Sequence, residues 1–324
     1  MNVALIGCSG MGRVHAAMLT QAGFRLVLCV DVNMSAAEAL GSAYGAEAAH
    51  DAAAAFQRRD VDVVCIATPT HTHAELVQAA ARAGKHIFCE KPFCRTVAQC
   101  RRTMDVVKKS KVKLFVGHVV RYFQEFEAMR RQIAEGKVGV PGFVKLYRGG
   151  IFPGGPNSWF ADYEKSGGVI LDCMIHDLDW LRYVFGNPRR IAALTLQRSQ
   201  PPLLDYAQVT VRMKNGVMAL VIGTWAHPSG FRVKAEICGS EGMVEYDSHE
   251  APVNAQKREV GVGPSMIVPS SPVDQSPYLL EWEDFRQWLQ GKGSPRVTPE
   301  DAIWAVRMAE AALQSAREGK PVAL

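Results

Sequence analysis

The sequence predicts a two-domain protein: an α/β domain built on a doubly wound parallel sheet, followed by an α+β domain with a large, mostly antiparallel sheet. With 324 residues, the chain is long enough for two separate hydrophobic cores. Up to residue 118, apolar strand-like runs alternate with helical segments, which is typical of a parallel sheet covered on both faces. Beyond that point strands follow one another through hairpin turns. We therefore expect domains at residues 1–120 and 121–324.

The predicted strands of the first domain are short apolar runs, each ending in a glycine or polar residue. They lie at 2–7, 25–31, 61–68, 86–90 and 112–118. Between them, helical periodicity and glycine or lysine stops predict the connecting helices. These lie at 12–23, 35–44, 73–85 and 96–110.

The second domain is predicted to open with a helix at 123–135 and a strand at 142–150. A loop rich in glycine, proline and aromatic residues then leads into one continuous helix over residues 166–186. Asn215-Gly216 lies between two β-rich runs and indicates a two-residue hairpin, and a second hairpin is expected around 239–242. A long loop over 248–277 and helices at 278–290 and 299–318 complete the chain.

Composition excludes several classes of protein. Apolar residues make up 48% and charged residues 21% of the chain, which is the profile of a globular protein. No run of about 18 apolar residues predicts a membrane span, and the N-terminus lacks the basic region of a signal peptide, so we expect a cytoplasmic protein. The basic clusters lack interleaved aromatic residues, so nucleic acid is not an expected partner.

The eight cysteines do not predict disulfides or a metal site. Cys29, Cys65 and Cys89 lie in apolar strand-like runs, where buried free thiols are common. No CxxC pair occurs, and the pair formed by Cys173 and His176 has no second pair at metal-ligand spacing. We therefore predict no metal.

A glycine-rich stretch, GCSGMG at 7–12, follows the first strand and precedes the first helix. It approximates the G-x-G-x-x-G pattern of a Rossmann domain, in which the backbone approaches a pyrophosphate at a helix N-terminus. An ordinary strand–helix turn is the alternative. The predicted cofactor contacts in this loop are Gly7, Ser9, Gly10, Met11 and Gly12.

Asp31 strengthens the nucleotide interpretation, because it ends the second strand nineteen residues after Gly12. A carboxylate at this place binds the ribose hydroxyls of NAD and repels the 2′-phosphate of NADP. Neither Val32 nor Asn33 supplies a compensating positive charge. The sequence therefore favours NAD over NADP.

Two further segments end neighbouring strands of the predicted parallel sheet, where ligands of such sheets bind. Thr68-Pro69-Thr70 follows the third strand, and Glu90-Lys91-Pro92 follows the fourth. An exposed loop lysine is the alternative interpretation of Lys91.

The helix predicted over 166–186 carries a narrow polar stripe on an otherwise apolar surface. On a wheel of about 100° per residue, Asp172, His176, Asp179 and Tyr183 gather on one side. A solvent-facing side is the alternative, but such sides normally carry Lys, Glu and Arg, and this stripe has none. Histidine titrates near neutrality and can exchange a proton with a hydroxyl group. We expect Asp172 and His176 to face a substrate and Asp179 to support them.

The glycine loop, Asp31, Glu90-Lys91-Pro92 and Asp172-x-x-x-His176 together resemble the Gfo/Idh/MocA oxidoreductases over nearly the whole chain. The resemblance implies that Lys91, Asp172 and His176 act at the reacting carbon. It also implies a cis Lys91–Pro92 peptide, a homodimer or homotetramer through the second sheet, and a nicotinamide-side loop. That loop comprises Thr68, Pro69, Thr70 and His73, with Glu90 and Lys91 as further cofactor contacts. Ser9 and Met174 depart from the family pattern, where glycine is common.

The expected function is hydride transfer between NAD and a secondary alcohol of a sugar, inositol or related polyol. Beside Lys91, Asp172 and His176, the expected substrate contacts are His118 and Arg121 after the fifth strand and Trp159 before the catalytic helix. Arg121 pairing with a carboxylate and Trp159 lying in the core are the alternatives. Two other functions stay open: an NAD-dependent lyase or glycosidase that oxidises its substrate transiently, and a catalytically silent nucleotide-bound sensor.

Overall fold

The computed structural model describes residues 1–198, 203–249 and 275–324, which form two compact units. The first unit comprises Met1–Val119 and Gln275–Ile303, and the second comprises Val120–Asp274 and Trp304–Leu324. The predicted boundary at residue 120 puts all later residues in the second domain, and for 275–303 this is wrong. These residues pack in the first unit because Trp282 and Phe285 bury their rings against Phe24 and Phe88.

The first unit is built on a six-stranded sheet in the order β3-β2-β1-β4-β5-β6. All of its strand pairs are parallel, which confirms the predicted doubly wound sheet. From β1 the chain adds β2 and β3 on one side and then β4, β5 and β6 on the other. Sheets of this kind bind ligands where the strand order reverses, which here is between β1 and β4. The strands are β1 (Asn2–Ile6), β2 (Arg25–Val30), β3 (Glu47–Ala49), β4 (Val63–Ile66), β5 (His86–Glu90) and β6 (Leu114–Gly117).

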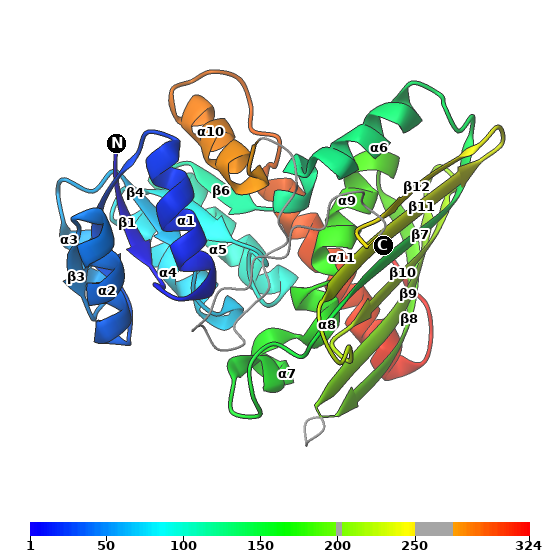
Figure 1. Ribbon diagram of the computed structural model, residues 1–324, viewed down its shortest axis with the longest axis horizontal. Helices are drawn as coiled ribbons and strands as arrows, with labels where there is room; N and C mark the ends of the chain where they lie inside the picture. Colours follow the sequence, from blue (N-terminus) through cyan, green and yellow to red (C-terminus); the bar gives the residue numbers. More distant parts are fainter. Residues whose placement is uncertain (199–202, 250–274) are drawn as a thin grey trace. The chain divides into compact units, whose positions relative to one another are not determined.

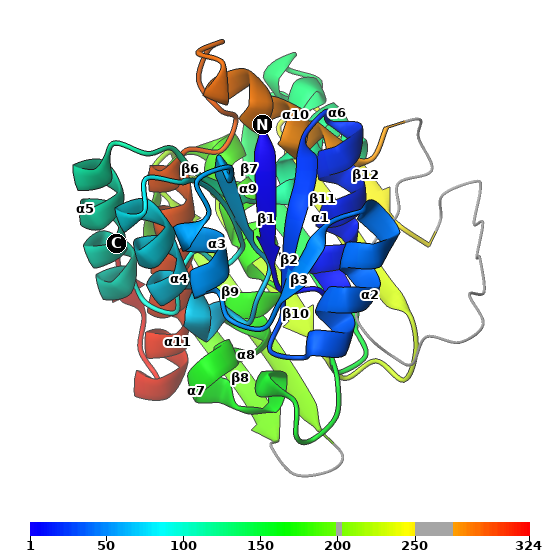
Figure 2. The same ribbon diagram turned by 90° about the vertical axis from the view of Figure 1, so that its left-hand side faces the viewer.

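Helices cover both faces of this sheet, with α1 and α2 on one side and α4 and α5 on the other (Figure 2). The short β3 and α3 are not predicted, because neither forms an apolar run long enough to show a period. The helices of this unit are α1 (Gly10–Gln21), α2 (Met34–Tyr44), α3 (Ala53–Gln57), α4 (Thr70–Arg82), α5 (Val97–Ser110) and α10 (Pro277–Leu289).

The second unit contains a seven-stranded sheet in the order β12-β11-β7-β10-β9-β8-β13. Among its described strands, only β7 and β10 pair in parallel, so the predicted mostly antiparallel sheet is confirmed. The strands are β7 (Pro141–Gly150), β8 (Pro188–Arg198), β9 (Leu204–Met213), β10 (Met218–Thr224), β11 (Phe231–Gly239), β12 (Met243–Asp247) and β13 (Val322–Ala323). The predicted hairpin joins β9 to β10 and has Gly216 at φ +98°.

The helices of the second unit lie on one face of its sheet (Figure 1). Strand β9 shows why, because its residues alternate strictly between buried and exposed, with Ala207, Val209 and Val211 buried beneath the helices. These helices are α6 (Gln124–Ala134), α7 (Tyr163–Ser166), α8 (Gly168–Asp172), α9 (Ile175–Phe185) and α11 (Pro299–Glu318), which starts in the first unit. No helix covers the opposite face within the described part of this unit.

The continuous helix predicted over 166–186 is wrong, because the chain breaks it into α7, α8 and α9. The break at Cys173-Met174 shifts the hydrogen-bonding pattern, since the amides of both residues donate to the carbonyl of Val169. Met174 is buried against Gly223 of β10, where a Cβ would lie 2.2 Å from the Met174 Cγ. The long side chain of Met174 therefore requires glycine on the facing strand.

Most of the loop predicted over 248–277 lies outside the described residues. Strand β12 ends at Asp247, and α10 begins at Pro277. No helix in the described ranges is long and apolar enough to cross a membrane.

Candidate active site

The glycine loop between β1 and α1 is packed so tightly that two of its positions exclude a side chain. A Cβ at Gly7, which has φ +95°, would lie 2.5 Å from the carbonyl oxygen of Ala67, and a Cβ at Gly12 would lie 1.9 Å from that of Gly7. Ser9 is exposed and precedes α1 without capping it through its side chain. The backbone amides at the start of this twelve-residue helix suit a pyrophosphate, as the sequence predicts.

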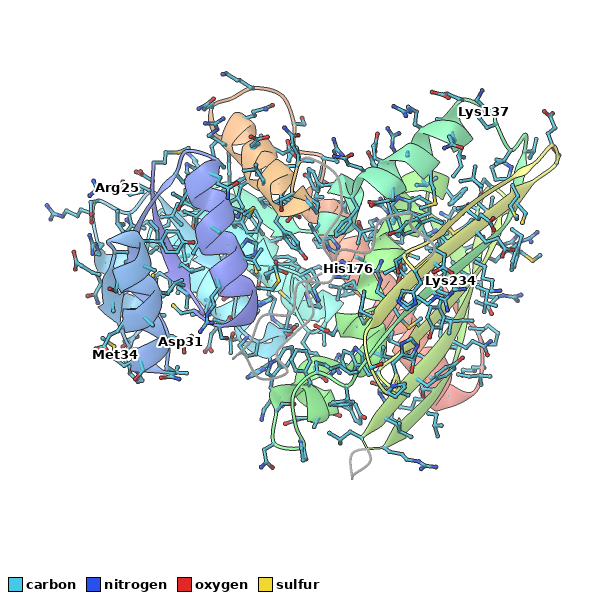
Figure 3. The ribbon with its side chains drawn as sticks, in the orientation of Figure 1. Arg25, Asp31, Met34, Lys137, His176 and Lys234 are labelled. Carbon is cyan, nitrogen blue, oxygen red and sulfur yellow. The ribbon has the colours of Figure 1, made fainter. Side chains whose placement is uncertain are left out.

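Asp31 joins the glycine loop to the end of β2. Its Oδ2 accepts the backbone N–H of Cys8 at 2.7 Å, and its Oδ1 accepts that of Asn33 at 2.8 Å. The carboxylate is partly exposed (labelled in Figure 3), and the neighbouring Val32 is an exposed apolar residue. Its free lone pairs fit ribose hydroxyls, so the residues present on β1, α1 and β2 fit NAD.

The predicted nicotinamide-side loop divides into exposed and buried positions. Thr68 and Pro69 are partly exposed, whereas Thr70 and His73 are buried. His73 lies between two backbone carbonyls, with Nδ1 2.7 Å from that of Pro92 and Nε2 2.8 Å from that of Thr68. Burial lowers the pKa of His73, against the effect of these carbonyls. Because both ring nitrogens face protein carbonyls, His73 ties two loops together, and its contact with the cofactor stays a prediction.

Lys91 is the only residue from Ile87 to Cys94 that is not buried. Its peptide bond to Pro92 is cis, as the resemblance implies. Glu90 lies behind it and accepts the backbone N–H of Lys91 at 3.0 Å. Burial alone would raise the pKa of Glu90, but its hydrogen bond with His15 and nearby positive charge lower it below the ordinary value. Glu90 is thus an ionised support for the loop that presents Lys91.

Asp172 and His176 are the only residues from Ser166 to Leu181 that are not buried. Asp172 ends α8, and His176 lies in the first turn of α9 (labelled in Figure 3). Although the helix break removes the regular spacing of the predicted polar stripe, these two side chains keep access to solvent. Both belong to the second unit.

Arg121 is a buried ion-pair partner, which is the alternative to a substrate contact that its sequence position left open. Its Nε and Nη2 donate to the two carboxylate oxygens of Asp179 at 2.7 and 2.6 Å. The guanidinium also lies 4.4 Å from the centre of the Tyr183 ring. On α9, Asp179 is therefore buried in an ion pair and Tyr183 is partly exposed beside the guanidinium. A second buried pair, Arg148 with Asp177, holds the same helix from β7.

The two remaining predicted substrate contacts differ in exposure. His118 is 1% exposed and both of its ring nitrogens are buried, so it presents no polar atom to solvent. Trp159 is partly exposed and packs on Phe160, with 4.0 Å between ring centres. Phe160 in turn meets the edge of Trp225. Trp159 thus forms the outer part of an aromatic cluster.

The sequence analysis missed Asp205, a buried carboxylate at an inward-facing position of β9. Its Oδ2 accepts the N–H of Val169 at 2.7 Å, at the start of the helix that carries Asp172. Burial raises the pKa of Asp205 to about 6, despite the bonds from Val169 and Gln197. The signal was present in the sequence, since Asp205 interrupts an otherwise apolar alternation with Ala207 and Val209.

All eight cysteines are free, and seven of them are buried. Burial raises the pKa of Cys65 and of Cys89, which keeps these thiols protonated and unreactive. Within the described ranges, no three His, Cys, Asp or Glu side chains come together in a way that could hold a metal ion.

A parallel sheet with a tight glycine loop and a carboxylate at the end of β2 defines a nucleotide-binding Rossmann domain. Residues 1–118 match the model of an oxidoreductase family with an NAD-binding Rossmann fold, and residues 126–245 match the GFO/IDH/MocA C-terminal domain. The chain belongs to the Gfo/Idh/MocA family. It is an NAD-dependent dehydrogenase of the inositol and sugar dehydrogenase type.

Relatives match the chain from end to end. Inositol 2-dehydrogenase of Rhizobium meliloti (strain 1021) is 32% identical, with 100% of this chain and 99% of the relative covered. The scyllo-inositol 2-dehydrogenase (NAD(+)) of Bacillus subtilis (strain 168) is 27% identical over 100% of this chain and 96% of its own length. The crystal structure of a putative myo-inositol dehydrogenase from Sinorhizobium meliloti 1021 superposes with a TM-score of 0.83, at 29% identity and with 100% and 99% of the two chains covered.

Proposed function

We propose that this dehydrogenase oxidises a secondary alcohol of an inositol, sugar or related polyol. The observation that carries the proposal is the selective exposure of three polar side chains. Asp172 and His176 are the only partly exposed positions in the otherwise buried stretch from Ser166 to Leu181, and Lys91 is the only one from Ile87 to Cys94. The names of the relatives, which include inositol 2-dehydrogenases, support a cyclic polyol as substrate.

In the proposed mechanism, three side chains act on one hydroxyl-bearing carbon. His176 accepts the proton of the reacting hydroxyl, because a neutral imidazole is a general base near neutral pH. Lys91 donates a hydrogen bond to the same oxygen and stabilises the negative charge that develops on it. Asp172 accepts a hydrogen bond from a hydroxyl group and thereby orients the ring.

When bound, NAD supplies the acceptor for the hydride. The residues that would hold it are the glycine loop from Gly7 to Gly12, Asp31, and the exposed positions Thr68 and Pro69. Glu90 contributes by fixing the backbone at Lys91. His73 contributes indirectly, by joining the loops that contain Thr68 and Pro92.

A plate assay of NADH fluorescence tests this function. Inositols, sugars and linear polyols are each incubated with NAD and, in parallel, with NADP. We expect NADH to form with at least one cyclic polyol and NAD to be preferred. His176→Ala should lower kcat by roughly 100- to 10 000-fold, the usual contribution of general acid–base catalysis. Lys91→Ala should lower it by roughly 100-fold or more, whereas the exposed Lys109→Ala serves as the matched control.

The same assay separates the other two functions. A lyase or glycosidase that oxidises its substrate transiently would convert substrate without net NADH. A nucleotide-bound sensor would bind NAD and turn over no hydroxylated compound. Full turnover in both His176→Ala and Lys91→Ala would contradict the assigned roles.

We further propose that the chain forms a homodimer or homotetramer through the second sheet. The face without helices carries Leu194 and Leu196 on β8 and Met218 on β10, all more than 45% exposed. On β9, Gln208 pairs with Leu194 and Tyr206 pairs with Leu196, so both lie on the same face. A sheet face with this many exposed apolar side chains is typical of an interface between subunits.

A further inference from the structure

A chain of three hydrogen bonds runs through the interior of the first unit and ends at the backbone of Lys91. The indole Nε1 of Trp282 donates to Nδ1 of His15 at 3.0 Å. Nε2 of His15 lies 2.8 Å from Oε1 of Glu90. The other oxygen of Glu90 accepts the backbone N–H of Lys91 at 3.0 Å. Trp282 comes from α10, 267 positions along the chain from His15.

This chain fixes the tautomer of His15. An indole nitrogen only donates, so Nδ1 of His15 must accept and carries no proton. A neutral imidazole then carries its proton on Nε2, which donates to the carboxylate of Glu90. The Glu90 carboxylate therefore accepts on both sides, once from His15 and once from Lys91.

The surroundings of the chain leave it little freedom to rearrange. His15 and Trp282 are fully buried. The ring of Trp282 stacks on Phe88 with 4.3 Å between centres, and His15 meets the edge of Phe88 at 5.0 Å. Because Phe88 lies on β5 two residues before Glu90, the same packing holds both the donor and the acceptor in place.

We propose that His15 is a positioning residue for Lys91, which it holds through Glu90, and that Trp282 keeps the proton of His15 on Nε2. This inference rests on the proposed role of Lys91 in the reaction. It predicts that a carboxylate at position 90 cannot be replaced by an amide. In Glu90→Gln, the side-chain NH2 must face either the N–H of His15 or the N–H of Lys91. In both arrangements two hydrogen-bond donors point at each other.

The conflict has one escape, and Trp282 blocks it. If His15 moved its proton to Nδ1, its Nε2 could accept from the amide of Gln at position 90, whose oxygen would then accept from Lys91. The indole N–H of Trp282 opposes a proton on Nδ1. Trp282→Phe removes that N–H and keeps an aromatic ring, so it should rescue the Glu90→Gln variant.

The test measures kcat, KM and NADH dissociation constants for both single variants and the double variant. Glu90→Gln should lower kcat by about 100-fold, the cost of misplacing a catalytic group by about 1 Å. Trp282→Phe alone should change kcat by about threefold or less. The kcat of the double variant should be about tenfold higher than that of Glu90→Gln, which is the effect of removing one hydrogen-bond conflict. NADH binding should stay within about threefold throughout. Trp288→Phe, on the same helix, is the matched control.

A second measurement needs neither substrate nor NAD. In protein labelled with ¹⁵N-histidine, the nitrogen chemical shifts of His15 should report a proton on Nε2 in the wild type and on Nδ1 in the double variant. A double variant no faster than Glu90→Gln, or a wild-type His15 with its proton on Nδ1, would overturn the proposal. If Trp282→Phe does not fold, the position of the proton on His15 in the wild type decides whether the proposal holds.

Failure of the proposed function gives a different result. If Lys91→Ala keeps full turnover, the role of Lys91 is wrong, and the histidine shifts still test the chain of hydrogen bonds. If Lys91→Ala is inactive and Glu90→Gln keeps full kcat, the positioning role alone is wrong.

Discussion

We propose that Asp31 is the residue that most directly sets the choice of cofactor. Its two oxygens hold the glycine loop and the start of the following turn, and no cation lies at Val32 or Asn33. We expect Asp31→Ser combined with Val32→Arg to shift the ratio of kcat/KM for NADP over NAD by roughly 10- to 100-fold, the value of one or two hydrogen bonds to a charged group. Val32→Arg alone is the control, and an unchanged NAD preference in the double variant would contradict the role of Asp31.

Asp205 makes folding stability depend on pH. Its pKa is about 6 in the fold and has an ordinary value of 3.8, because burial disfavours the charged form. The stability associated with the protonated carboxyl is complete below about pH 4 and is lost as the pH rises towards 6. Asp205→Asn should therefore equal the wild type near pH 3.5 and exceed it by about 3 kcal/mol above pH 6.

Urea unfolding at pH 3.5, 5 and 7.5 measures this difference. The exposed Asp105→Asn provides a matched control and should show no such pH-dependent gain. A gain for Asp205→Asn that is equal at all three values would show that the substitution acts through packing and not through ionisation.

At the residue scale, the sequence could predict side chains that keep access to solvent in otherwise apolar stretches. Lys91, Asp172 and His176 stand out for this reason. Sequence spacing could not show which carboxylate pairs with Arg121, because Asp179, which accepts from its Nε and Nη2, lies 58 residues away. His15 could not be connected with Trp282, since nothing local joins residues at such a separation.

Met174 and Gly223 illustrate a dependence between elements. Because a Cβ on Gly223 would come within 2.5 Å of the Met174 sulfur, Gly223→Ala should destabilise the protein by about 1–3 kcal/mol through overpacking. Met174→Ala should relieve the clash, so the double variant should lose less stability than the two single losses added. Chemical unfolding of the four proteins measures the coupling.

Gly142→Ala is the matched control for this cycle, because a Cβ on that strand glycine meets nothing within 4 Å. Strict additivity of Gly223→Ala and Met174→Ala would contradict the proposed contact.

At the element scale, periodicity predicted the strands and most helices, because each buries a regular apolar face. It failed where the helix over 166–186 breaks. Leu171 and Ile175 near the break are buried and apolar, so the hydrophobic pattern continues across Cys173 and Met174 and conceals the change in hydrogen bonding.

For the whole molecule, the exposed face of the second sheet predicts assembly. Leu194→Glu with Leu196→Glu should convert the proposed oligomer into monomers, because charges buried without partners between two sheets are strongly unfavourable. Light scattering during size-exclusion chromatography measures the mass. Val140→Glu changes an equally exposed apolar residue outside the strands and should leave the mass unchanged. A monomeric wild type would contradict the proposal directly.

The sequence predicted both sheets and their order along the chain, but not the return of residues 275–303 to the first unit. Helical periodicity shows that α10 has an apolar face, and it does not show which core receives that face. The deciding contacts are those of Trp282 and Phe285 with Phe24 and Phe88, which lie far from them in the sequence.

This return has a consequence for recombining the chain with its relatives. A chimera joined at residue 120 would inherit His15, Glu90 and Lys91 from one parent and Trp282 from the other. Each such chimera would thus pair the His15 imidazole of one parent with the Trp282 indole of the other, even if both parents fold well. Exchanges that respect the physical unit need three junctions, near residues 119, 275 and 303, and should transplant the nucleotide-binding half with its internal contacts intact.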